Sequence, residues 1–99
     1  MIAKVKYEFV ASVWQHSATC GWWFVSLPET MSEEIRTHFG WQESGWGRLQ
    51  STVKIGNTTW ETSIWFDKKH QTYILPIKTQ VRISETILLN QILEIALWV

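Results

Sequence analysis

The sequence lacks most of what a metal centre or a known catalytic site requires. Cys20 is the only cysteine among 99 residues, so no intramolecular disulfide can form, and a small domain without one is typical of a reducing compartment. The three histidines are scattered, and no CxxC or HxxxH pair is present, so we expect no metal site. Paired carboxylates and a glycine-rich phosphate loop are also missing. We therefore expect no catalytic residues and no cofactor.

An excess of charge of one sign is missing as well. Nine basic and nine acidic side chains give a formal net charge of zero. A domain that binds nucleic acid through its phosphates normally carries a basic excess, so we expect no nucleic-acid partner. No apolar run is long enough for a membrane span, and the first residues contain no apolar signal core. We therefore expect no membrane contact and a cytoplasmic location, and near-zero net charge leaves both a monomer and a homodimer open.

Tryptophan, in contrast, is abundant. The length predicts a single domain over residues 1–99, and the small core of such a domain cannot easily bury eight tryptophans. We expect some of them to be half exposed, along a groove or at an interface.

Alternating apolar and polar residues predict a mainly β domain. The clearest local signal is Gly56-Asn57, a two-residue loop between two alternating runs, which predicts a tight hairpin with a primed turn. The register set by this turn places Val53 opposite Trp60 on the inward face. We expect about six strands in all, which in a chain of this length favours a small closed β-barrel over a sandwich.

Two helical segments are expected besides the strands. Thr30 to Glu33 has the pattern of a capping box, with Thr30 as the N-cap, and Gly40 is a stop signal. These signals predict one amphipathic helix over about 30–39. Residues 79–86 are expected to form a short helical turn.

The order of several motifs resembles a known family. The motifs are Trp46-Gly47-Arg48, the hairpin 55–60, the strand 62–67, the segment 73–78 with its Leu-Pro and Lys, Val81-Arg82, and an early Leu27-Pro28. This order is similar to the DUF1905 family, a domain of unknown function, over nearly the whole chain. The resemblance implies a double-split β-barrel, related in shape to swapped-hairpin barrels, with no enzyme activity and no cofactor. Family members often carry Gly-Asp before the final strand, where this chain has Asn90-Gln91; because Asn also tolerates positive φ, we expect the turn to remain.

A binding site is predicted around the short helical turn. Lys78 and Arg82 are four residues apart and share one helical face, with Thr79 as the expected N-cap. A carboxylate or phosphate at this corner would accept charge-assisted hydrogen bonds from Arg82. Trp65, with Arg48 stacked on it across the hairpin, is the candidate aromatic wall.

A structural role for the same cations is the alternative. In that interpretation Arg82 pairs with Glu85, Glu94 or the terminal carboxylate, and Lys78 is merely solvated.

The sequence thus favours a non-enzymatic binding or interaction domain that accepts a small anion or a protein partner. One alternative is a nucleic-acid-binding barrel of the swapped-hairpin type, which zero net charge argues against. Another is an enzyme with an unrecognised active site, for example with Cys20 as nucleophile beside a histidine.

Overall fold

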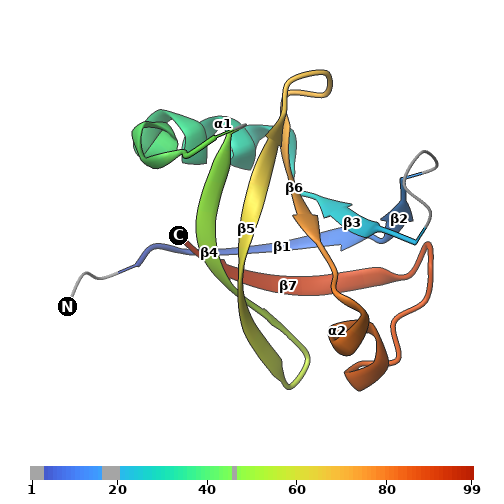
Figure 1. Ribbon diagram of the computed structural model, residues 1–99. Helices are drawn as coiled ribbons and strands as arrows, with labels where there is room; N and C mark the ends of the chain where they lie inside the picture. The colour runs from blue at the N-terminus through green and yellow to red at the C-terminus, as the bar shows by residue number, and fades with distance from the viewer. Residues whose placement is uncertain (1–3, 17–20, 46) are drawn as a thin grey trace.

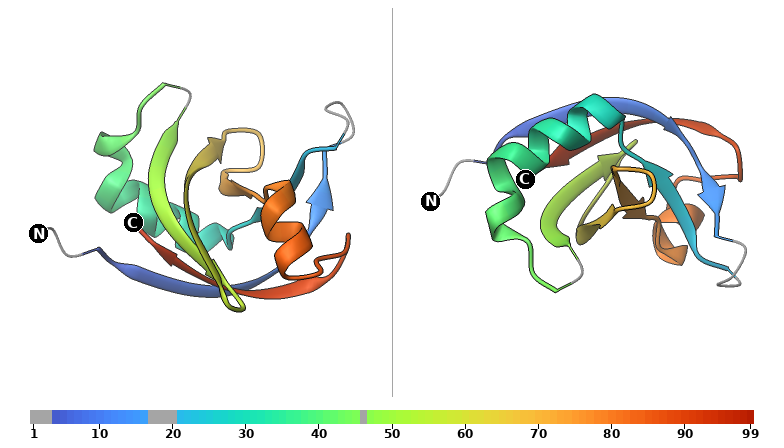
Figure 2. Two further views of the ribbon diagram at one scale, coloured as in Figure 1. Left: turned by 60° about the horizontal axis from the view of Figure 1, so that its bottom comes forward. Right: turned by 90° about the horizontal axis from the view of Figure 1, so that it is seen from above.

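One antiparallel sheet dominates the computed structural model, which describes residues 4–16, 21–45 and 47–99 (Figure 1). The strands of this described part follow the spatial order β1-β7-β4-β5-β6-β3-β2, and the sheet curls into a half-barrel (Figure 2). Their bounds are β1 (Lys6–Ser12), β2 (Trp14–Gln15), β3 (Trp23–Ser26), β4 (Arg48–Ile55), β5 (Thr58–Asp67), β6 (Thr72–Pro76) and β7 (Ile92–Trp98).

Both edges of the sheet come from the same stretch of chain. β1 pairs with β7, whereas β2, one residue further along, pairs with β3. Val13 separates the two strands, and its amide and carbonyl bond instead to Gln91 and Asn90, at 3.0 and 2.8 Å. The predicted mainly β class is confirmed, but the described sheet has seven strands, because a short strand that was not predicted, β2, follows directly after Val13. The predicted closed six-stranded barrel is instead a curled half-barrel in the structure.

The predicted hairpin register is confirmed throughout β4 and β5. Val53 lies opposite Trp60, and Arg48 lies opposite Trp65. Gly56 has a φ of 58°, whereas Asn57 is outside the left-handed region, which is the pattern of a type II′ turn. Val53 is fully buried and Trp60 is partly buried against the core. The expectation for the last turn is also confirmed, since Asn90 has a φ of 66°.

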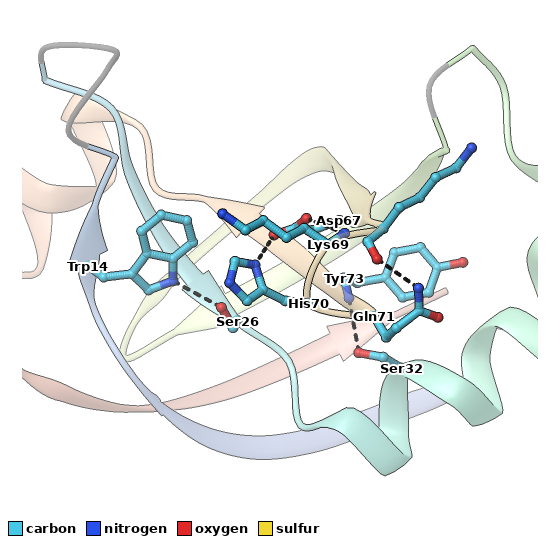
Figure 3. Close-up of polar contacts among 9 residues, drawn as sticks. Trp14, Ser26, Ser32, Asp67, Lys69, His70, Gln71 and Tyr73 are labelled. Carbon is cyan, nitrogen blue, oxygen red and sulfur yellow. Dashed lines mark hydrogen bonds and ion pairs between the residues drawn. The ribbon is translucent and has the colours of Figure 1, made fainter.

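Two α-helices lie at opposite ends of the curled sheet (Figure 1). They are α1 (Glu29–Phe39), which is followed by a 3₁₀ turn, η1 (Gly40–Gln42), and α2 (Thr79–Ser84). The predicted capping box is wrong, because α1 begins after Pro28 and has no side-chain cap. Ser32, within the predicted box, is buried, and its hydroxyl accepts a hydrogen bond from the Tyr73 amide at 3.0 Å (Figure 3).

The core fills the concave side of the sheet. It combines aliphatic and aromatic residues of nearly every strand with Ile35 of α1 and Val81 of α2. Burying such side chains is the main source of stability in a domain of this size. No helix in the described part of the chain is long and apolar enough to cross a membrane.

Candidate functional site

The five residues that the sequence predicted as a site line one pocket. Arg48 and Trp65 come from the β4–β5 hairpin, and Lys78, Thr79 and Arg82 come from the start of α2. The pocket has a volume of about 480 Å³, which is within the range of small-molecule sites. The fold joins the two groups because β6 pairs with β5, with Ile74 opposite Trp65, and then runs directly into α2.

Arg82 is the most closely constrained cation of the pocket. Its guanidinium carbon lies 4.3 Å from the ring centroid of Trp23, in a cation–π contact, and its Nη2 donates to Thr79 Oγ1 at 2.8 Å. Its Nε is buried and has no hydrogen-bond partner among the described residues. A buried donor without a partner is energetically costly.

The structural alternative for Arg82 is not supported by the geometry. Within the described residues, Arg82 forms no ion pair with Glu85, Glu94 or the terminal carboxylate. Glu85 is engaged elsewhere, because its Oε2 accepts a hydrogen bond from Thr58 Oγ1 at 2.6 Å. The positive charge of Arg82 therefore has no ion-pair partner in the part of the chain that the structure describes.

The predicted stacking of Arg48 on Trp65 is wrong, although the two residues are opposite each other. The Arg48 backbone pairs with Ser44 in both directions at 2.9 Å, and this bends the preceding loop back toward the side chain. As a result, Arg48 Nε donates to the Gly45 carbonyl at 3.2 Å. The ring beside Trp65 is Trp22 instead, with a centroid distance of 6.1 Å.

Thr79 is part of the pocket but is not the N-cap. Lys78 holds the cap position, with φ −66° and ψ 156°, and Thr79 is the first residue of α2. The Thr79 hydroxyl positions Arg82 rather than capping the helix. Because a helix dipole sums over aligned peptide units, the six residues of α2 contribute little, and attraction for an anion rests on the side chains.

The local charge of the pocket differs from that of the whole chain. Its described lining holds three cations, Arg48, Lys78 and Arg82, and no carboxylate. Thr62 and Ser63 of β5 add two hydroxyls that can donate or accept hydrogen bonds. A chain with zero net charge thus concentrates positive charge at one place, which favours an anion there.

Trp22 and Trp23, which line the pocket, are absent from the predicted site. Trp23 is the first residue of β3, and Trp22 directly precedes it. Trp22 is 50% exposed, and its ring lies 6.1 Å from that of Phe24 as well as from that of Trp65. The expectation that some tryptophans are half exposed is confirmed. The Trp-Trp doublet was the available signal, since the two rings of adjacent strand residues cannot both enter the core.

Other titratable groups form hydrogen bonds outside this pocket. The buried Tyr73 hydroxyl donates to the Glu43 carboxylate, and burial together with this bond raises the pKa of Tyr73. Burial alone would raise the pKa of Asp67, but hydrogen bonds from His70 and from the Lys69 amide lower it overall (Figure 3). The described residues contain no cluster of potential metal ligands, and Cys20 lies outside them.

The fold and the pocket define a small, mainly β half-barrel domain with a cationic pocket lined by tryptophan. The family model for Domain of unknown function (DUF1905) matches residues 9–97, which is nearly the whole chain. The chain belongs to this family. A search of curated proteins found no match.

Proposed function

We propose that this domain is a non-enzymatic binding module that holds a small organic anion in the pocket between β3, β5 and α2. The observation that carries the proposal is Arg82, a pocket-lining cation that has no ion-pair partner among the described residues. An anion in the pocket would accept a charge-assisted hydrogen bond from the Arg82 guanidinium and would supply the missing counter-charge.

The size and lining of the pocket support a small ligand. A volume of about 480 Å³ suits a small organic molecule better than the flat, wide contact of a protein partner. The tryptophan rings would bury an apolar part of the ligand, while the cations would fix its anionic end. Among the described lining residues there is no histidine, cysteine or carboxylate that could act as a general base, which favours binding over catalysis.

Two of the cations outside the pocket are paired with carboxylates. Lys6 forms an ion pair with Glu8 at 3.1 Å, and Arg36 lies 3.9 Å from Glu43. A nucleic-acid backbone needs several uncompensated cations along its path. This arrangement therefore favours a single small anion over a duplex.

The proposal can be tested by NMR with a panel of small anions. The indole N–H signals of ¹⁵N-labelled protein would be assigned through Trp→Phe variants, and the protein would be titrated with benzoate, an aromatic phosphate and inorganic phosphate. We expect at least one organic anion to shift the signals of Trp22, Trp23 and Trp65, while that of the exposed Trp41 stays in place.

Charge-matched variants complete the experiment. Arg82→Gln should abolish the shifts, whereas Lys54→Ala removes a positive charge outside the pocket and should leave them unchanged. If no anion shifts the pocket indoles, or if the two variants behave alike, the proposed function is wrong.

A further inference from the structure

The cations and the tryptophan rings of the pocket together indicate the chemical class of the anion that it binds. We infer that the ligand is a phosphate monoester carried on an aromatic ring system, the chemistry of a mononucleotide. This inference rests on the proposed function, because it assigns the chemical class of the anion in the same pocket.

The cationic end of the pocket matches a phosphate better than a carboxylate. A phosphate monoester carries a charge of about −1.5 to −2 near neutral pH and presents three acceptor oxygens, whereas a carboxylate carries one charge on two oxygens. The pocket offers Arg48, Lys78 and Arg82 with no carboxylate in its described lining. A monoanion would leave most of this charge uncompensated, and a dianion would neutralise more of it. The Arg82 guanidinium and the Lys78 ammonium are donors of the two kinds that phosphate sites commonly use.

The aromatic end of the pocket offers the exposed part of Trp22 for stacking. The face of Trp23 is covered by Arg82, whose guanidinium carbon lies 4.3 Å from the ring centroid. Trp22 and Trp65 are 6.1 Å apart and inclined at 45°, so they contact each other and leave no parallel slot for a third ring. The Trp22 ring is also stacked against Phe24, at 6.1 Å and 28°, but half of the Trp22 surface stays exposed, and a flat ring would stack on this exposed part.

The two ends are held together by the fold. Trp22 and Trp23 are consecutive residues, and the Trp23 carbonyl accepts a hydrogen bond from the Ile77 amide at 2.8 Å, immediately before Lys78. The stacking face and the cations are thus fixed to the same junction of β3 and α2. One molecule with a ring and a phosphate can contact both, whereas a separate nucleoside or phosphate contacts only one.

The first test is isothermal titration calorimetry with matched probes. We expect adenosine monophosphate to bind at least about tenfold more tightly than adenosine or inorganic phosphate, because charge-assisted hydrogen bonds and stacking each contribute on that scale. Benzoate should bind more weakly than adenosine monophosphate. A short single-stranded oligonucleotide without a terminal phosphate should bind no more tightly than the mononucleotide.

The pH dependence of binding identifies the charge of the bound ligand. The second ionisation of a phosphate monoester has a pKa of about 6, so affinity should rise several-fold between about pH 5 and pH 7. The charged groups in the described lining are Arg48, Lys78 and Arg82, and no histidine or carboxylate is among them. Benzoate is already ionised over this range and is the control for any titration of the protein itself.

Variants separate the two ends of the site. Trp22→Ala should lower the affinity for adenosine monophosphate about tenfold while leaving the affinity for inorganic phosphate unchanged. Trp41→Ala is the control, because Trp41 is an exposed tryptophan outside the pocket. Arg82→Gln should lower the affinity for both adenosine monophosphate and inorganic phosphate, and thermal melts should show that the variant is folded.

The outcomes distinguish this inference from the proposed function. If benzoate binds as tightly as adenosine monophosphate and neither affinity rises with pH, the phosphate assignment is wrong and the anion site stands. If the oligonucleotide binds more tightly than the mononucleotide, the assignment to a small molecule is wrong. If no probe binds at the pocket, both fail.

Discussion

Replacing Gly56 with alanine tests how the tip of the β4–β5 hairpin is attached to the end of α2. Gly56 has a φ of 58°, a region that alanine adopts at a cost of about 1–2 kcal/mol. An added Cβ would also lie only 2.0 Å from Oε1 of Glu85. Glu85 is a flexible side chain and can rotate away, but its carboxylate would then lose the 2.6 Å hydrogen bond from Thr58.

The expected cost is the sum of these two effects. A hydrogen bond to a charged group contributes about 1.5–3 kcal/mol, and partial burial at this site favours the lower end of that range. Gly56→Ala should therefore lower the free energy of unfolding by about 3 kcal/mol. For a domain of this size, each kcal/mol corresponds to a fall in Tm of about 4–8 °C.

A double-mutant cycle with Glu85→Ala separates the two contributions. Urea denaturation would be measured for the parent, both single variants and the double variant. In the Glu85→Ala background, Gly56→Ala should cost only the backbone strain of about 1–2 kcal/mol. If it costs the same amount in both backgrounds, the carboxylate does not brace the hairpin and the reasoning is refuted.

Three further predictions follow from the structure. Thr86 follows α2 and has a φ of 52°. The Ile87 amide bonds to the Arg82 carbonyl and the Thr86 amide to the Ile83 carbonyl, which is a Schellman arrangement that favours glycine at this position. Thr86→Gly should therefore raise the free energy of unfolding by about 1 kcal/mol in urea denaturation, and a decrease would contradict this. Trp60 is half-buried, and its buried Nε1 has no hydrogen-bond partner in the described chain. Trp60→Phe should lower the free energy of unfolding by less than about 1 kcal/mol, whereas Trp60→Ala should lower it by about 3 kcal/mol. Equal losses for the two variants would exclude a packing role for the ring. Labelled duplex DNA should show no micromolar binding at low salt, and binding that weakens steeply with added salt would favour the nucleic-acid-binding alternative.

Features that depend on neighbouring residues could be predicted from the sequence. The register of the hairpin follows from Gly56-Asn57, because a two-residue loop leaves only a few turn geometries. The turn at Asn90 follows from the tolerance of Asn for positive φ. The capping box failed because α1 begins at Glu29, directly after Pro28, so Thr30 lies inside the first turn and does not cap the helix. The short strand β2 could not be predicted, because it depends on pairing with β3 at the other edge of the sheet.

The features of the candidate site that depend on neighbouring residues could likewise be predicted, whereas those that depend on distant strands could not. Lys78 and Arg82 could be found from their spacing of four, although Lys78 is the N-cap of α2 and not a helical residue. The outward position of Trp65 followed from the hairpin register. The contact of Arg82 with Trp23 could not be predicted, since it requires β3 to pair with β6 and so bring the start of β3 beside α2. The sequence pattern places residues on faces of elements, and only the pairing of distant strands determines which faces meet.

The position of Glu85 explains why Arg82 remains uncompensated. A glutamate three residues after an arginine on a helix is normally close enough to pair with it, and the sequence alone cannot exclude this. In the structure Glu85 is the C-cap of α2 and reaches the hairpin, where Thr58 donates to its carboxylate at 2.6 Å. The Gly56 position leaves room for that carboxylate because it lacks a Cβ. The contact that fixes the hairpin tip therefore also keeps the nearest acidic side chain away from Arg82, and the positive charge of the pocket is available to a ligand.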